Sequence, residues 1–158
     1  MRILQIEDEV FSDYSKISML VVVPFCTTCC WKELGLDSSI CQNDNPRGLP
    51  ILDYSNRKII ERYVNNPLTN AIVFGGMDAW DSINEIIELI KLFRETSDDD
   101  VVLYTGRKYS EIASKMYDLE RFKNVYVKVG RYIPNQKPVI DKITGVKLAN
   151  RGQYFIKV

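Results

Sequence analysis

No histidine occurs among the 158 residues of the chain. This absence removes the commonest general base, the commonest zinc ligand and every nucleophile that a neighbouring imidazole activates. Any chemistry of this protein must therefore use sulfur, carboxylates or a bound cofactor.

An excess of charge of either sign is also missing. The sequence has 21 Lys and Arg residues against 21 Asp and Glu residues, so it lacks the basic field that attracts a phosphate backbone. The longest apolar run, residues 19–25, is far too short to cross a bilayer. We expect a soluble, cytoplasmic protein with no nucleic-acid or membrane partner.

The sequence contains no internal repeat, low-complexity tract or convincing linker. A chain of 158 residues fits one domain, and a domain of this size buries about two thirds of the surface that its unfolded form exposes. We therefore expect a single domain over residues 1–158, which needs neither a disulfide nor a metal merely to fold.

Four cysteines are present, and all of them fall within residues 26–41. In a reducing compartment, such a cluster favours metal or redox chemistry over a structural disulfide. Three interpretations compete: small buried hydrophobes, a thioredoxin-like dithiol formed by Cys26 and Cys29, and an iron-sulfur cluster held by thiolates of a loop. Zinc ranks below the cluster, because the adjacent Cys29 and Cys30 rarely both bind one tetrahedral ion.

Strand-like and helix-like segments alternate along the chain. Apolar runs predict strands at residues 2–6, 18–25, 70–76, 101–106, 124–130 and 152–158, and apolar faces predict helices at residues 55–66, 81–95 and 108–122. This alternation predicts an α/β fold with a mainly parallel sheet, whose ligands bind at the carboxyl ends of the strands.

Local signals add expectations about the helix ends and loops. Ser55 is able to cap the first long helix, and Ser82 with Glu85 has the pattern of a capping box. The acidic run at residues 98–100 has the pattern of a solvated loop. A loop rich in Pro, Gly and Asn is expected at residues 43–50.

Several short motifs occur in a definite order. A CxxxC pair (residues 26–30) follows an early strand and precedes "CQN" (41–43), "FGGMD" (74–78), "LYTGR" (103–107), "VGRYI" (129–133) and "NRGQY" (150–154). In this order the chain resembles the radical SAM activating proteins of anaerobic ribonucleotide reductase, and the resemblance covers most of the sequence.

The resemblance implies a fold, a cofactor and an activity. The fold is an incomplete parallel β/α barrel of the radical SAM type that holds a [4Fe-4S] cluster on three thiolates and leaves one iron open for S-adenosylmethionine. Reductive cleavage of S-adenosylmethionine generates a radical, which would activate a glycyl-radical ribonucleotide reductase. The implied electron donor is a flavodoxin or a ferredoxin.

The resemblance also implies which residues form the site. The implied cluster ligands and catalytic residues are Cys26, Cys30 and Cys41, with Cys29 as an alternative ligand. The residues implied to contact S-adenosylmethionine are Ile40, Gly75, Gly76, Asp78 and Thr105. For Asp78 and Thr105 the residues themselves leave helix capping and turn formation open as alternatives.

A second hypothesis keeps the fold and changes the chemistry. Met77 stands where the family usually has an acid after Gly-Gly, and Val129 rather than an aspartate directly precedes Gly130. These differences favour an iron-sulfur binding or electron-carrier module of the same fold.

Overall fold

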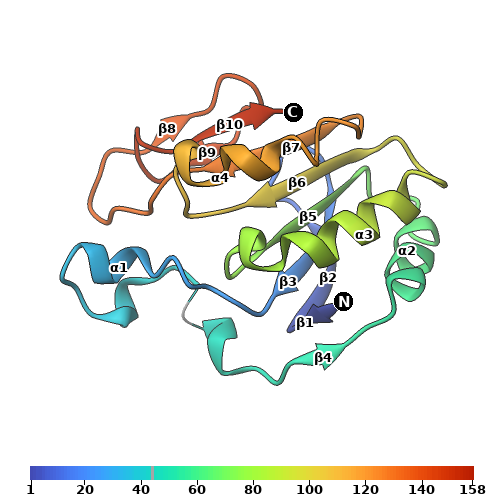
Figure 1. Cartoon of the computed structure of the whole chain (residues 1–158), viewed down its shortest axis with the longest axis horizontal. Helices are drawn as coiled ribbons and strands as arrows, with labels where there is room; N and C mark the ends of the chain where they lie inside the picture. The colour runs from blue at the N-terminus through green and yellow to red at the C-terminus, as the bar shows by residue number, and fades with distance from the viewer. Residues whose placement is uncertain (44) are drawn as a thin grey trace.

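The structure is a computed structural model that describes residues 1–43 and 45–158. Its centre is a six-stranded sheet (Figure 1) in the order β10-β7-β6-β5-β3-β2. The strands are β2 (Gln5–Val10), β3 (Ser18–Val23), β5 (Ala71–Gly76), β6 (Asp100–Tyr104), β7 (Val125–Val129) and β10 (Tyr154–Lys157).

Four of these strands, β3, β5, β6 and β7, run parallel, and the two edge strands β2 and β10 run antiparallel to their neighbours. The reversal at β2 follows from chain length, since the few residues between β2 and β3 are too short for the crossover that a parallel pair needs. No strand pairing within residues 1–43 and 45–158 joins β10 to β2. The incomplete barrel stays a prediction.

Helices and short strands complete the fold. The helices are α1 (Cys30–Glu33), α2 (Asn56–Val64), α3 (Ile83–Phe93) and α4 (Tyr109–Met116), with 3-10 turns η1 (Ser38–Ile40), η2 (Asn45–Gly48) and η3 (Ala79–Ser82). The short strands β1 (Arg2–Ile3) and β4 (Leu52–Asp53) pair with each other, as do β8 (Val139–Ile140) and β9 (Lys147–Leu148). Turn η2 lies within the loop expected at residues 43–50, of which Asp44 is outside the described residues.

The two faces of the sheet are covered by different parts of the chain. Ile72 and Phe74 of β5 pack in a core with the apolar faces of α2, α3 and α4. Ala71 and Val73, their neighbours in the strand, pack on the other face against Tyr14, Leu148 and other residues outside the helices. Because both faces are buried, the strand is apolar throughout.

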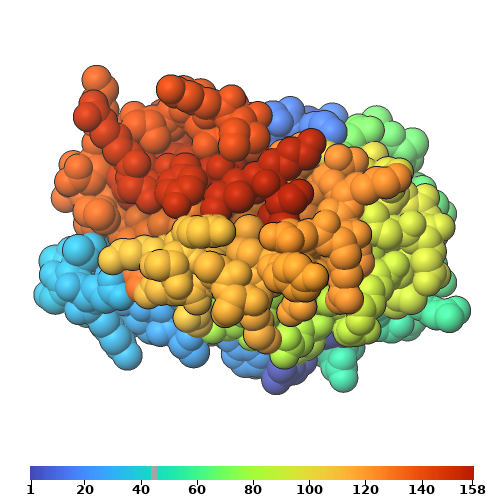
Figure 2. Space-filling view, turned by 45° about the horizontal axis from the view of Figure 1, so that its top comes forward, coloured from blue at the N-terminus to red at the C-terminus, as the bar shows by residue number. Residues whose placement is uncertain are grey.

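The C-terminal part of the chain therefore closes the face that α2, α3 and α4 leave uncovered. Figure 2 shows this part in orange and red, with the segment that carries α1 beside it in cyan. The cysteine segment and the C-terminal residues, far apart in sequence, thus form neighbouring parts of one surface.

Ser55 and Ser82 stand at the N-cap positions of α2 and α3, as expected, but the hydrogen bonds expected of them are not formed. Neither Ser55 nor Ser82 makes a side-chain capping hydrogen bond, and the hydroxyl of Ser82 is buried without a partner among the described residues. Glu85 binds the backbone N–H of Arg2 at 2.6 Å instead of closing a capping box. Its partner comes from the start of the chain, which a local sequence pattern does not show.

The acidic run is also only partly a solvated loop. Asp100 lies in β6 and is 6% exposed. Its carboxylate accepts a hydrogen bond from the hydroxyl of Tyr14 at 3.0 Å and forms an ion pair with Lys16 at 2.6 Å. Asp98 remains exposed and pairs with Lys123. Polar contacts thus hold the amino end of β6 to the loop before β3, in addition to the packing of the core.

No helix among residues 1–43 and 45–158 combines the length and the apolar character that a membrane crossing requires.

Candidate functional site

A cavity of about 280 Å³ lies at the carboxyl ends of the parallel strands, on the face of the sheet opposite α2, α3 and α4. Every residue that the sequence analysis placed in the site lines this cavity: Cys26, Cys29, Cys30, Ile40, Cys41, Gly75, Gly76, Asp78 and Thr105. The chain brings them together because β3, β5 and β6 are parallel neighbours, so the segments that follow them meet at one edge.

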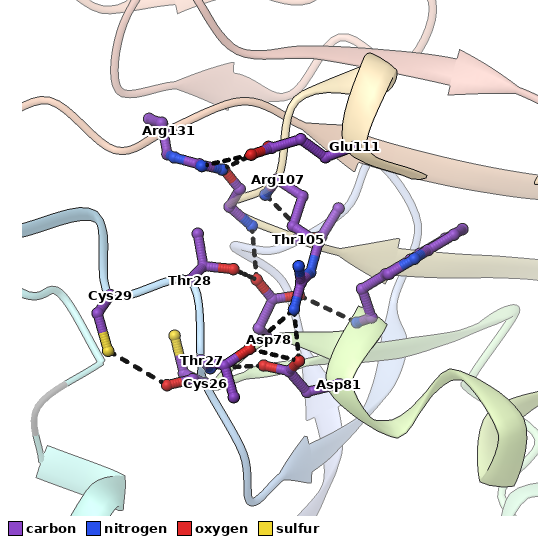
Figure 3. A network of polar contacts seen from close by, with 12 residues as sticks. Cys26, Thr27, Thr28, Cys29, Asp78, Asp81, Thr105, Arg107, Glu111 and Arg131 are labelled. Atoms are coloured by element: carbon purple, nitrogen blue, oxygen red, sulfur yellow. Dashed lines mark hydrogen bonds and ion pairs between the residues drawn. The ribbon is translucent and has the colours of Figure 1, made fainter. Parts of the chain in front are cut away.

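The cysteine segment leaves β3 and turns sharply before α1. Cys29, at the start of the helix, has a left-handed backbone with φ of 43°, a conformation that non-glycine residues seldom adopt. Its thiol donates a hydrogen bond to the backbone oxygen of Cys26 at 3.3 Å (Figure 3). All four cysteines are free thiols of intermediate exposure.

Two aspartates fasten this segment to the sheet. Asp81 accepts hydrogen bonds from the N–H and hydroxyl of Thr27 at 2.6 and 2.8 Å, and also pairs with Arg107 at 2.6 Å. Asp78 accepts from the hydroxyl of Thr28 at 2.7 Å. Figure 3 shows both carboxylates facing the threonines, so the position of the cysteines depends on residues that follow β5.

The carboxylate of Asp78 is almost fully used by the protein. The residue is 1% exposed, and it caps η3 through a hydrogen bond from the N–H of Trp80 at 3.0 Å. Its other oxygen accepts from Thr28 and from the N–H of Gly106, the latter at 3.1 Å. Capping, one of the two alternatives for Asp78, is therefore observed.

The glycines of this region serve different purposes. A Cβ at Gly76, where φ is 80°, would lie 2.3 Å from Val22, and one at Gly75 would lie 3.3 Å from Leu20. Gly76 is thus required by the packing of β5 against β3, whereas a side chain at Gly75 would make only a tight contact with the end of Leu20. A Cβ at Gly106 would instead lie 2.9 Å from the sulfur of Cys30, so Gly106 makes room for a cysteine of the site.

Thr105 and Cys41 take part in local turns. The hydroxyl of Thr105 accepts a hydrogen bond from the N–H of Arg107 at 3.0 Å, which is the turn role left open for it. The N–H of Cys41 donates to the backbone oxygen of Ser38, the first residue of η1, which also contains Ile40. Both Cys41 and Ile40 reach the cavity from this turn.

Comparisons of the chain with protein-family models, with curated proteins and with solved structures gave no match.

Lys128 is a residue of the cavity that the sequence analysis did not select. It alternates on β7 with Val127 and Val129, whose side chains join the helix-covered core, so its own side chain lies on the cavity face. Lys128 is 7% exposed, and burial lowers the pKa of its ammonium to about 8. A lysine within an otherwise apolar strand was the available signal.

Two further residues were missed because they come from outside the strand ends. Asp13, from the loop after β2, lines the cavity, and burial raises the pKa of its carboxyl. Gln153 lines it from the segment before β10. Neither belongs to a motif, and only the three-dimensional contacts bring them to the site.

Burial also controls the chemistry of the thiols. It raises the pKa of Cys26 to about 11 and raises the pKa of Cys30, although a backbone contact with Tyr132 and the charges of Arg131 and Lys128 oppose the latter. Both thiols are therefore protonated at neutral pH in the ligand-free chain. A reactive dithiol needs the opposite shift, so this geometry disfavours the thioredoxin-like interpretation.

Among the residues that the structure describes, no three Cys, Asp or Glu side chains are grouped closely enough to hold one metal ion. An iron-sulfur cluster makes a different demand, because its thiolates bind different irons and so need not converge on one point.

Proposed function

We propose that this protein is a small radical SAM enzyme that binds a [4Fe-4S] cluster through Cys26, Cys30 and Cys41. The observation that carries the proposal is the placement of these three free thiols around one cavity at the carboxyl ends of parallel strands. Thiolates are the usual ligands of such clusters.

The donor set supports three ligands from this segment better than four. Cys29 has the strained left-handed backbone, and its thiol is bound to the backbone oxygen of Cys26. Its neighbour Cys30 lies against Gly106, where a side chain would collide with the sulfur. Three ligands fit the cluster, and Cys29 is left as the alternative ligand.

The arrangement of layers is also consistent with a barrel-type fold. The long helices α2, α3 and α4 pack on one face of the sheet, and the cavity lies on the other. In a β/α barrel the helices form the outer layer, and the ligand binds at the carboxyl ends of the strands.

When bound, the cluster supplies the electron that cleaves the sulfonium of S-adenosylmethionine. The chain's own residues position and enclose the reactants. Asp78 and Asp81 hold the cysteine segment through Thr28 and Thr27. Gly75, Gly76, Thr105 and Ile40 line the cavity. Metal binding must also displace the thiol protons, which burial holds in place on Cys26 and Cys30.

The partner enzyme and the electron donor that we propose follow from the family resemblance. We propose that the radical activates an anaerobic, glycyl-radical ribonucleotide reductase in the cytoplasm, with flavodoxin or ferredoxin as the electron donor. The decisive experiment is anaerobic reconstitution with iron and sulfide, followed by S-adenosylmethionine and dithionite. Release of 5′-deoxyadenosine is expected, and failure to form any cluster would rule the proposal out.

A specific observation favours a second candidate, an iron-sulfur or electron-carrier module. The carboxylate of Asp78 already accepts three hydrogen bonds from the protein, and residue 77 is Met, so little acidic capacity remains for the ammonium of S-adenosylmethionine. A reconstituted cluster that neither binds nor cleaves S-adenosylmethionine would support this candidate.

A further inference from the structure

Lys128 carries a buried ammonium that makes few direct polar contacts with the protein. Its ammonium makes one long hydrogen bond, to the backbone oxygen of Gly130 at 3.4 Å, and lies 5.9 Å from the centre of the Tyr104 ring. No ion pair within 4.0 Å joins it to a carboxylate of the described residues. An ammonium has three donor hydrogens, so its hydrogen-bonding capacity is mostly unused.

A buried ammonium with unused donors costs folding free energy unless another group pairs with it. A buried ammonium normally pairs with an anion or loses its proton. Lys128 is 7% exposed, and it lines the same cavity as Cys30 and Asp78. The unused donors therefore face a space that can hold a ligand.

The surroundings restrict the ligand's charge. Asp78 and Asp13 also line the cavity, and their carboxylates disfavour a group with two negative charges. Gln153 donates weakly to the same oxygen of Gly130 at 3.5 Å, so its amide places a second N–H donor near Lys128. Arg47 and Lys147 also line the cavity but are exposed. Lys128 is a buried cation with a neighbouring amide, and this pair of donors matches a carboxylate.

We propose that Lys128 forms a carboxylate-binding subsite in this cavity. The inference rests on the proposed function and deepens it, because it states which part of the cavity holds the acidic group of the ligand. The carboxylate belongs either to S-adenosylmethionine or to a separate small-molecule substrate.

The test uses the ligand-free, reduced protein, so that it does not depend on a cluster. S-adenosylhomocysteine, which has the carboxylate, and 5′-methylthioadenosine, which lacks the amino-acid part, are titrated by calorimetry into wild type, Lys128→Met and Lys128→Arg. Lys128→Met should weaken S-adenosylhomocysteine about 30-fold, the loss expected for one charge-assisted contact. Binding of 5′-methylthioadenosine should change less than about twofold, and Lys128→Arg should recover part of the affinity.

The matched control is Lys142→Met, since Lys142 is exposed and lies outside the lining of the cavity. It should leave both affinities nearly unchanged. Equal losses for both nucleosides in Lys128→Met would overturn the proposal, because they would indicate a structural role.

A second arm identifies the source of the carboxylate. Acetate and its neutral analogue acetamide are titrated into the ¹⁵N-labelled protein, and the amide signals of Thr105, Gly106 and Gly130 are followed. Acetate-specific shifts that vanish in Lys128→Met, without any effect on S-adenosylhomocysteine, would assign the carboxylate to a separate substrate. Absence of both effects overturns the subsite and leaves the cluster test of the proposed function unaffected.

Discussion

The sulfur of Cys30 occupies the space in which a side chain at Gly106 would lie, since a Cβ there would be 2.9 Å from it. Gly106 follows β6 and Cys30 begins α1, so the contact joins two segments that are distant in sequence.

Gly106→Ala should therefore displace Cys30 without breaking the fold. Overpacking of this kind costs about 1–3 kcal/mol of unfolding free energy, and we expect loss of the reconstituted cluster's visible absorption. Gly48→Ala is the control, because a Cβ at Gly48 meets nothing within 4 Å. Normal cluster formation in Gly106→Ala would show that Cys30 is not a ligand.

The cysteines should differ in their importance. Cys41→Ala and Cys26→Ala should each abolish stable cluster binding, because each removes one of three thiolates. Cys29→Ser should retain the cluster, since the thiol of Cys29 is hydrogen-bonded to the backbone oxygen of Cys26. Iron and sulfide analysis after reconstitution measures the cluster content of each variant. Cluster loss in Cys29→Ser together with retention in Cys41→Ala would make Cys29 the third ligand in place of Cys41.

Two carboxylates near the cavity, Asp78 after β5 and Glu33 of α1, should contribute unequally to stability. Asp78 is buried and satisfies three donors, so Asp78→Ala should cost about 3 kcal/mol by leaving buried donors unpaired. Glu33 pairs with Arg131 at 2.7 Å, but its side chain is 49% exposed, so Glu33→Ala should cost less than about 1 kcal/mol. Urea unfolding of both variants checks the order, and equal losses would contradict it.

The buried Lys128 predicts a dependence of stability on pH. Burial lowers the pKa of its ammonium from 10.5 to about 8. Between these values the unfolded chain binds more protons than the folded one, so the free energy of unfolding rises with pH, by up to about 3 kcal/mol. Lys128→Met should be more stable than wild type at pH 7, and its advantage should shrink above pH 8.

The measurement is urea unfolding of both proteins at pH 7 and pH 10, where the difference between them isolates Lys128 from other titrating groups. Parallel pH profiles for wild type and variant would show that the ammonium is not destabilised by burial.

The order of strands and helices could be predicted from the sequence because each buried strand is a continuous apolar run. Residues 70–76, for example, form β5 (Ala71–Gly76), with core packing on both faces. The meeting of the cysteines with Gly75, Asp78 and Thr105 at one edge also followed, since parallel strands place their carboxyl ends together.

Other features depend on contacts that a single sequence does not contain. Glu85 binds Arg2 instead of capping its helix, and Gly76 is needed because Val22 lies against it on the neighbouring strand. Asp13 and Gln153 enter the cavity from the two edges of the sheet. Local patterns report local structure, and these residues act through distant partners.

The cavity has one wall from residues 26–43 and another from residues 146–153. A growing chain therefore completes its four thiols long before the opposite wall has been synthesised. Until residue 153 has left the ribosome, the cavity lacks this wall, so the thiols are more open to oxidants and to free metal ions than they are in the folded chain.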